Sequence, residues 1–182
     1  MRLHFGCSDK YPGPIEGWDN LDIKPTDKRI KVCDVTKGLP YPDNSVEAIY
    51  SCHTFEHFTR KEASFVIKEC WRVLQENGLI KIVVPDLDDI IDIFYDFKNS
   101  QKKFVFGKKF INREEFLLFV LSQEGQHKYT YSQRSLTKLL KETGFHPIEQ
   151  TETNKESRYP IYTSIPDFPN KSLSMVGIKW TN

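Results

Sequence analysis

The sequence predicts an α/β fold in which a mostly parallel sheet carries helices on its faces. Seven short apolar runs have the composition and length of strands, and segments with helical periodicity separate several of them. The run at 79–84 is apolar nearly throughout, as expected for a central parallel strand that is buried on both faces. Alternating strands and helices favour a parallel sheet, whose ligands bind at the carboxyl ends of the strands.

Apolar and β-branched runs place the strands along the chain. The first run ends at Gly6 and the second ends at Asp22, and the turn-forming residues 38–44 separate the third run from the fourth. Pro85 ends the fifth run. The predicted strands are residues 3–5, 18–22, 29–35, 46–52, 79–84, 145–151 and 172–180.

Capping signals place the helices between these strands. Thr59 followed by Glu62 has the pattern of a capping box, and the same pattern recurs at Asn112. Ser132 is the expected cap of a further helix, which stops at Gly144. The predicted helices are residues 60–76, 86–97, 113–123 and 133–143.

Composition restricts the protein class. The 182 residues fit one domain, and 26 Lys and Arg against 25 Asp and Glu give a net charge of +1, so no global attraction to nucleic acid or to an anionic membrane is expected. The N-terminal residues lack the apolar core of a signal peptide, and no apolar run is long enough to span a membrane. We therefore expect a cytoplasmic protein.

The cysteines show no pattern of a metal site. Cys7, Cys33, Cys52 and Cys70 have no CxxC spacing, and three of them lie within or at the ends of strand-like runs, where a thiol behaves as a small hydrophobe. We therefore expect no zinc site among them.

A glycine and an acid at the ends of the first two strands indicate a nucleoside pocket. Gly6 allows a backbone turn to pass close to a ligand, because glycine adopts φ values that other residues resist. Asp22, at the end of the neighbouring strand, is placed to accept hydrogen bonds from both ribose hydroxyls.

The complete series of strand ends resembles the class I methyltransferases that depend on S-adenosylmethionine (SAM). The turn Gly6-Cys7-Ser8 resembles the first motif of that family, and Asp22 matches its ribose-binding acid. Asp34, followed by the Leu-Pro-Tyr-Pro-Asp turn at 39–43, resembles the acid that contacts adenine and the turn after it. The resemblance covers residues 3–90, with weaker similarity at 131–145.

This resemblance implies a Rossmann-like, doubly wound sheet of seven strands with an antiparallel last strand, in three layers α/β/α. It implies one methyltransferase-like domain over residues 1–182, in which 98–131 form an inserted helical or loop cap. It also implies an enzyme whose cofactor is SAM. The residues expected to bind the cofactor are Gly6, Cys7, Ser8, Asp22, Ile23, Asp34, Val35 and Ser51.

The glycine turn itself favours SAM over a dinucleotide. A dinucleotide places its pyrophosphate at a helix N-terminus, but only about a dozen residues separate Phe5 from Asp19, near the minimum for a parallel crossover. The usual first helix is therefore expected to be shortened or absent. Asp9 would repel a phosphate, whereas the cationic sulfonium and amino groups of SAM would not be repelled.

Histidines after the fourth strand are the candidate catalytic groups. His53 and His57 can remove a proton at neutral pH, although His57 bonded to the backbone and His53 lining the cofactor pocket is an equally acceptable reading. His127, Tyr129 and Tyr131 form a polar aromatic group suited to holding a substrate, or else a solvated loop.

Asp86, Asp88 and Asp89 are the acids that could suggest a divalent cation, but acids at a helix N-terminus explain them more simply. No metal is therefore expected at any position of the chain.

The expected function is methyl transfer from SAM to a small-molecule, sugar or lipid-linked acceptor, with oxygen as the expected acceptor atom. One alternative is a binding or scaffold protein that keeps the fold without the cofactor. Another is a nucleic-acid methyltransferase that uses the basic segment 98–113, which could equally mediate a homo-oligomer contact. Against nucleic acid, residues 51–54 read Ser-Cys-His-Thr and lack the Asn-Pro-Pro-Tyr or Asp-Pro-Pro-Tyr tetrad of amino-directed DNA enzymes.

Overall fold

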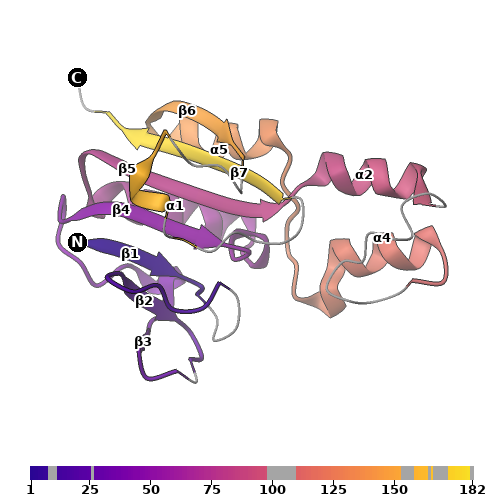
Figure 1. The fold of residues 1–182 in the computed structure, drawn as a ribbon, viewed down its shortest axis with the longest axis horizontal. Coiled ribbons are helices and arrows are strands. Elements are labelled where there is room, and N and C mark those ends of the chain that lie inside the picture. The colour runs from indigo at the N-terminus through magenta and orange to yellow at the C-terminus, as the bar shows by residue number, and fades with distance from the viewer. Residues whose placement is uncertain are drawn as a thin grey trace.

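In the part of the chain that the structure describes, seven strands form one mixed sheet in the order β3-β2-β1-β4-β5-β7-β6 (Figure 1). The computed structural model describes residues 1–7, 12–25, 27–97, 110–152, 158–163, 165 and 172–180. Strands β1 to β5 pair in parallel, and β7 is antiparallel to both of its neighbours, β5 and β6. The predicted fold class, a mostly parallel seven-stranded sheet whose last strand is antiparallel, is therefore confirmed. The strands are β1 Arg2–Phe5, β2 Asp19–Asp22, β3 Ile30–Val32, β4 Val46–Cys52, β5 Leu74–Pro85, β6 Phe145–Thr151 and β7 Ser172–Lys179.

The helices begin at the predicted caps. Thr59 accepts a hydrogen bond from the backbone N–H of Glu62 at 3.2 Å, and the Glu62 carboxylate accepts one from the N–H of Thr59 at 2.8 Å, which completes the capping box. The α-helices are α1 Arg60–Val73, α2 Leu87–Tyr95, α4 Arg113–Ser122 and α5 Gln133–Thr143. Short 3₁₀ helices are η1 Val35–Lys37, η2 Phe55–His57, η3 Gln123–Gly125 and η4 Pro160–Tyr162.

Helix α1 ends earlier than its sequence pattern predicts. Leu74 continues the apolar spacing of the helix, but its backbone is extended and it pairs with Val46 at the start of β4. The Leu74 side chain is completely buried in the strand, and the helical spacing also assigns it to the apolar side of α1, so periodicity alone does not separate the last helical turn from the first strand residue. The predicted end at residue 76 is therefore wrong by three residues.

Helices α1 and α5 cover one face of the sheet. Their apolar sides meet Leu3, Ile49 and Ile80 in the larger core cluster. Trp71 of α1 contacts the ring of Phe145 edge-on, with ring centroids 4.9 Å apart. This face contains the helix layer that the alternating sequence pattern predicts.

Among the described residues, the other face is covered by non-α-helical segments. Residues 12–18 and the turn η4 bring Trp18 and Tyr162 together over the sheet, with ring centroids 6.1 Å apart. The Tyr162 hydroxyl donates a hydrogen bond to the Ile49 carbonyl at 3.1 Å. The described part of the connection between β1 and β2 has no helix, as its length predicts.

Helices α2 and α4 lie beyond the carboxyl end of β5 and pack on each other (Figure 1). Their contact is apolar and includes Ile90, Phe116 and Val120. The proposed cap begins at residue 98, and its segment 98–109 lies outside the described residues. No α-helix in the described part of the chain is long and apolar enough to span a membrane.

A buried amide fixes the segment that replaces the first helix. The Asn20 side chain donates to the carbonyls of Ile15 and Trp18, both at 2.9 Å, and accepts from the N–H of Ile15 at 2.8 Å. The same oxygen lies 3.1 Å from Nδ1 of His4, which therefore donates its proton. These bonds satisfy backbone groups that a helix would otherwise satisfy internally.

His4 should make the protein sensitive to mild acid. The imidazole is fully buried, and burial lowers its pKa to about 4, with the Asn20 hydrogen bond and the Asp22 charge opposing the shift. The unfolded chain takes up this proton near pH 6.5, whereas the folded chain resists it, so acid favours unfolding. We predict that the free energy of unfolding falls by up to about 3 kcal/mol between these two pKa values because of His4 alone.

Urea unfolding followed by circular dichroism across this pH range measures the effect. His4→Gln should reduce the acid-dependent loss of stability, whereas the same change at the exposed His146 should leave it unaltered. Equal pH dependence in wild type and His4→Gln would contradict the assignment.

Candidate functional site

A cavity of about 590 Å³ opens at the carboxyl ends of β1 to β4. The parallel strands end at one edge of the sheet, so the loops that follow them meet there. Residues of the predicted site that line the cavity are Gly6, Asp22, Ile23, Asp34, Val35, His53 and His57. The lining residues that sequence reasoning did not single out are Cys33, Thr36, Thr54, Phe58, Glu62, Gln126 and Lys128.

Gly6 occupies a position that no side chain fits. Its φ of +66° lies in the left-handed region, and its N–H donates to the Leu21 carbonyl at 2.9 Å. A Cβ atom here would lie 2.6 Å from Cγ2 of Thr54. Thr54 is held in place, because its hydroxyl donates to the carbonyl of Cys52 at 3.1 Å. The loops after β1 and β4 therefore touch at Gly6.

Two acids stand at the ends of neighbouring strands. Asp22 ends β2, and its Oδ1 accepts from the Lys24 N–H at 3.0 Å. Asp34 caps η1, and its Oδ1 accepts from the N–H and the hydroxyl of Thr36 at 3.0 and 2.6 Å. These local bonds fix the direction of each carboxylate, and both residues remain part of the cavity wall.

Apolar groups accompany the two acids. Val35 is buried, whereas Ile23 is 57 % exposed at the cavity. Burial raises the pKa of the Cys33 thiol, and the Asp34 charge adds to the shift, so the thiol stays protonated at neutral pH. The wall is therefore suited to a flat apolar group whose edges carry hydrogen-bonding atoms.

Two of the expected cofactor residues lie outside the lining. Cys7 is fully buried, and its thiol donates to the Leu21 carbonyl at 3.4 Å. Ser51 is also fully buried and sits within β4, paired with Phe5 on one side and Ile82 on the other. The sequence does not show that Ser51 is buried. A serine near a predicted strand end could lie in the loop, but β4 continues to Cys52 and keeps Ser51 inside the sheet. Ser8 lies outside the described residues.

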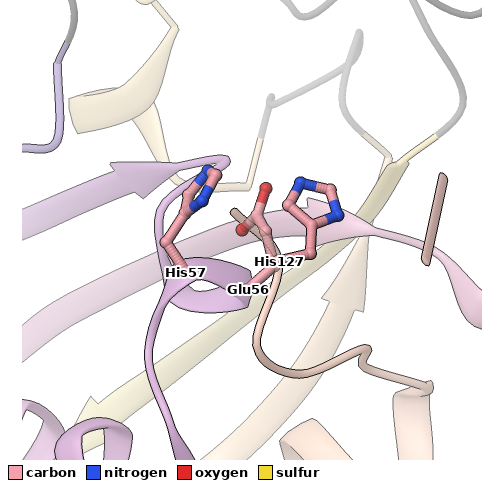
Figure 2. Close-up of side chains that lie close together, drawn as sticks. All are labelled: Glu56, His57 and His127. Carbon is pink, nitrogen blue, oxygen red and sulfur yellow. The ribbon is translucent and has the colours of Figure 1, made fainter. Parts of the chain in front are cut away.

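A carboxylate and two imidazoles gather beside the cavity. Figure 2 shows the Glu56 carboxylate between the rings of His57 and His127. One ligating atom from each residue lies within 4.8 Å of those of the other two, and the two ring centroids are 5.0 Å apart. Sequence reasoning identified both histidines but passed over Glu56. The available signal was the position of that acid directly before His57 in a loop that follows a strand.

Backbone carbonyls fix the tautomers of these histidines. Nδ1 of His57 lies 3.1 Å from the Gln126 carbonyl, and Nδ1 of His127 lies 2.8 Å from the Val120 carbonyl. A carbonyl can only accept, so each Nδ1 carries a proton and each neutral ring keeps its lone pair on Nε2. Burial lowers the pKa of His127, although the Glu56 charge opposes this shift.

His53 lines the cavity and contacts the cluster through Glu56. Its backbone is left-handed, with a φ of +49°, which is uncommon outside glycine. Nδ1 lies 3.2 Å from Oε1 of Glu56, and Nε2 lies 3.0 Å from the Ser172 hydroxyl. The sequence left open a non-catalytic arrangement in which His57 bonds to the backbone and His53 lines the pocket. The structure shows both of these contacts. A general-base role for either residue stays a prediction.

The expected substrate group is divided between two places. His127 lies beside His57, whereas Tyr129 and Tyr131 line a second cavity of about 350 Å³ next to α1 and α5. Their rings meet edge-on at 4.8 Å. Burial raises the pKa of the Tyr131 hydroxyl, so this group is protonated at neutral pH. A substrate role for the two tyrosines is a prediction that the position of the first cavity does not support.

A family model agrees with this fold and cavity. Residues 16–82 match the family described as a methyltransferase domain. The matched segment includes Asp22 and Asp34 and the loop that carries His53 and His57. No curated protein sequence matches the chain significantly.

Solved structures share the fold at low sequence identity. A SAM-dependent methyltransferase from Archaeoglobus fulgidus is 14 % identical with a TM-score of 0.61, and the match covers 98 % of this chain and 85 % of that one. A Haloferax volcanii complex with the Trm112 methyltransferase activator gives 15 % identity, a TM-score of 0.58, and coverage of 99 % and 82 %. Phosphoethanolamine N-methyltransferase 2 from Haemonchus contortus, solved with SAM, is 13 % identical with a TM-score of 0.58. That match covers 99 % of this chain and 48 % of the other.

The family model and the fold together confirm the resemblance to class I SAM-dependent methyltransferases. The model matches residues 16–82 of the 182-residue chain, and the strand order and antiparallel β7 belong to the fold that the chain shares with these enzymes.

Substitution at Gly6 tests how tightly the two loops meet. We predict that Gly6→Ala lowers the melting temperature and weakens binding of S-adenosylhomocysteine (SAH), because the added methyl group collides with Thr54. Gly17→Ala is the matched control, since Gly17 also has a positive φ, of +76°, but no atom of a described residue lies within 4 Å of its Cβ position. Backbone strain of about 1 kcal/mol or more is common to both changes.

Melting curves with and without SAH separate the two effects. Wild type and Gly17→Ala should both gain stability from the ligand, whereas Gly6→Ala should gain little. If Gly6→Ala responds to SAH as Gly17→Ala does, the collision at Thr54 does not control the cavity.

Proposed function

We propose that this protein transfers a methyl group from SAM to a hydroxyl of a small-molecule, sugar or lipid-linked acceptor. The observation that carries the proposal is the placement of Asp22 and Asp34 on one cavity wall, with the close turn at Gly6 beside them. Acids at the ends of adjacent strands match the hydrogen-bonding groups of an adenosine, and the cavity volume is in the range of cofactor sites.

The geometry supports one orientation of the cofactor. The ribose hydroxyls would donate to Asp22, and the adenine edge would face Asp34 between Ile23 and Val35. The methionine part would then extend toward Gly6, where the absence of a side chain leaves the backbone accessible. Asp22 and Asp34 place negative charge in the same cavity as the sulfonium, and Lys128, a described cation of the lining, pairs with Glu62 at 3.4 Å.

Methyl transfer requires mainly positioning. The acceptor oxygen forms a bond to the methyl carbon as the carbon–sulfur bond breaks, and the electron pair of that bond neutralises the sulfur. Acceleration comes from holding oxygen, carbon and sulfur in line, with the reacting atoms about 3 to 3.5 Å apart. The acceptor hydroxyl must also lose its proton, so a base near the cavity would assist the reaction.

His57 is the best-placed candidate for this base. It lines the cavity, and its Nδ1–H bond to the Gln126 carbonyl leaves the Nε2 lone pair able to accept a proton. His53 is less suitable, because both of its ring nitrogens contact other side chains. The number of ring nitrogens already in contact with other groups therefore distinguishes His57 from His53, which the sequence alone does not.

Asp22→Asn tests the cofactor orientation. Asparagine can still accept the Lys24 N–H, so the turn after β2 should persist while the charged acceptor for ribose is lost. We predict that SAH binding weakens by about 1.5 to 3 kcal/mol, the range for a hydrogen bond to a charged group. Isothermal titration calorimetry measures this change.

Asp92→Asn, an exposed change on α2, serves as the control and should bind SAH like wild type. Unchanged SAH affinity in a folded Asp22→Asn protein would refute the ribose assignment. Absence of SAH binding to wild type at millimolar concentration would instead support the scaffold alternative.

A further inference from the structure

The Glu56, His57 and His127 cluster is built by two loops that are tied together through their backbones. Glu56 and His57 belong to η2, which follows β4, whereas His127 follows η3. The Glu56 carbonyl accepts hydrogen bonds from the N–H groups of Lys128 and Tyr129, at 2.8 and 3.1 Å. The three side chains are therefore brought together by backbone contacts that do not depend on the side chains themselves.

Glu56 carries a buried carboxylate that receives no hydrogen bond from the residues that the structure describes. The residue is 1 % exposed, and neither carboxylate oxygen has a hydrogen-bond partner among the described residues. Nδ1 of His53 lies 3.2 Å from Oε1, a distance that allows an electrostatic contact without the geometry of a hydrogen bond. Burying a carboxylate in this way is costly unless a charge or a metal compensates it.

The two histidines are oriented as metal ligands usually are. Each donates its Nδ1 proton to a backbone carbonyl, and this bond fixes the ring and leaves the Nε2 lone pair available. Imidazoles that bind metals in proteins commonly donate the other ring N–H to a carbonyl or a carboxylate.

We propose that Glu56, His57 and His127 form a binding site for one divalent transition-metal cation. Two imidazole nitrogens and one carboxylate suit cations such as Zn²⁺, Co²⁺ or Mn²⁺, whereas Mg²⁺ and Ca²⁺ prefer oxygen ligands alone. In the tetrahedral geometry of Zn²⁺ sites, bonds of about 2.0 to 2.2 Å place the ligand atoms about 3.3 to 3.6 Å apart. The ligand atoms of the three residues lie within 4.8 Å of one another, so they would move closer by up to about 1.5 Å when a cation binds.

The site has a consequence for catalysis that rests on the proposed methyl transfer. A cation would take the Nε2 lone pair of His57 and would therefore replace His57 as the group that promotes loss of the acceptor proton. Three protein ligands leave at least one coordination position open, and His57 places that position beside the cavity. An acceptor hydroxyl bound there would lose its proton to solvent more readily, since a bound cation lowers the pKa of an oxygen ligand. The acceptor oxygen would then take the methyl group, and the electron pair of the broken bond would remain on sulfur.

Calorimetric titration of the metal-free full chain with Zn²⁺, and separately with Co²⁺, tests the site. We expect wild type to bind one equivalent and to give bound cobalt a visible absorption spectrum. Glu56→Gln and His127→Gln should each weaken binding by more than about 100-fold, beyond the range caused by loss of an outer-shell partner. His146→Gln removes an exposed histidine on β6 and should bind both cations like wild type.

Circular dichroism and SAH titration of the same variants separate the possible failures. Absence of stoichiometric Zn²⁺ and Co²⁺ binding to wild type would overturn the proposal, and so would unchanged affinity in His127→Gln. If Glu56→Gln fails to fold, His127→Gln still decides the matter, because His127 lies in a partly exposed loop. Metal binding without SAH binding would support the cation site while rejecting the proposed function.

Discussion

The parallel pairing of β1 with both β2 and β4 places the three loops that carry Gly6, Asp22 and His53 side by side. β1 is short, and its carboxyl end stands between the ends of its two neighbours. The loop with Gly6 therefore lies between the Asp22 loop on one side and the Thr54 and His53 loop on the other. Because Gly6 has no side chain, the loop after β1 packs directly against Thr54 in the loop after β4.

The same pairing explains how the second face of the sheet is covered without a complete helix layer. β1 and β2 bury polar side chains, His4 and Asn20, on the face opposite α1. Asn20 uses its amide to hold residues 15–18 against the sheet, and the aromatic residues Trp18 and Tyr162 then complete the apolar cover. The hydrogen bonds and aromatic contacts of a short connection thus replace the packing of an amphipathic helix. The missing helix does not change the edge of the 590 Å³ cavity, because residues that follow the strand ends form that edge.

Local signals predict most of the fold, and tertiary contacts decide the rest. The strand at Val46–Cys52 and the capping box at Thr59 follow from residues that are adjacent or one helical turn apart. The burial of Cys7 and Ser51 could not be predicted in this way, because moving one position along a strand end separates a core side chain from a cavity side chain. The approach of Glu56 to His127 is also hidden in the sequence, since backbone bonds between distant loops create it.

A crystal structure of the protein with SAH would locate the cofactor directly. We expect adenosine density in the 590 Å³ cavity, with the ribose hydroxyls within hydrogen-bonding distance of Asp22 and the adenine edge facing Asp34. Density for SAH in the second cavity, beside Tyr129 and Tyr131, would refute the assignment of the two acids. So would a ribose that contacts neither of the two acids.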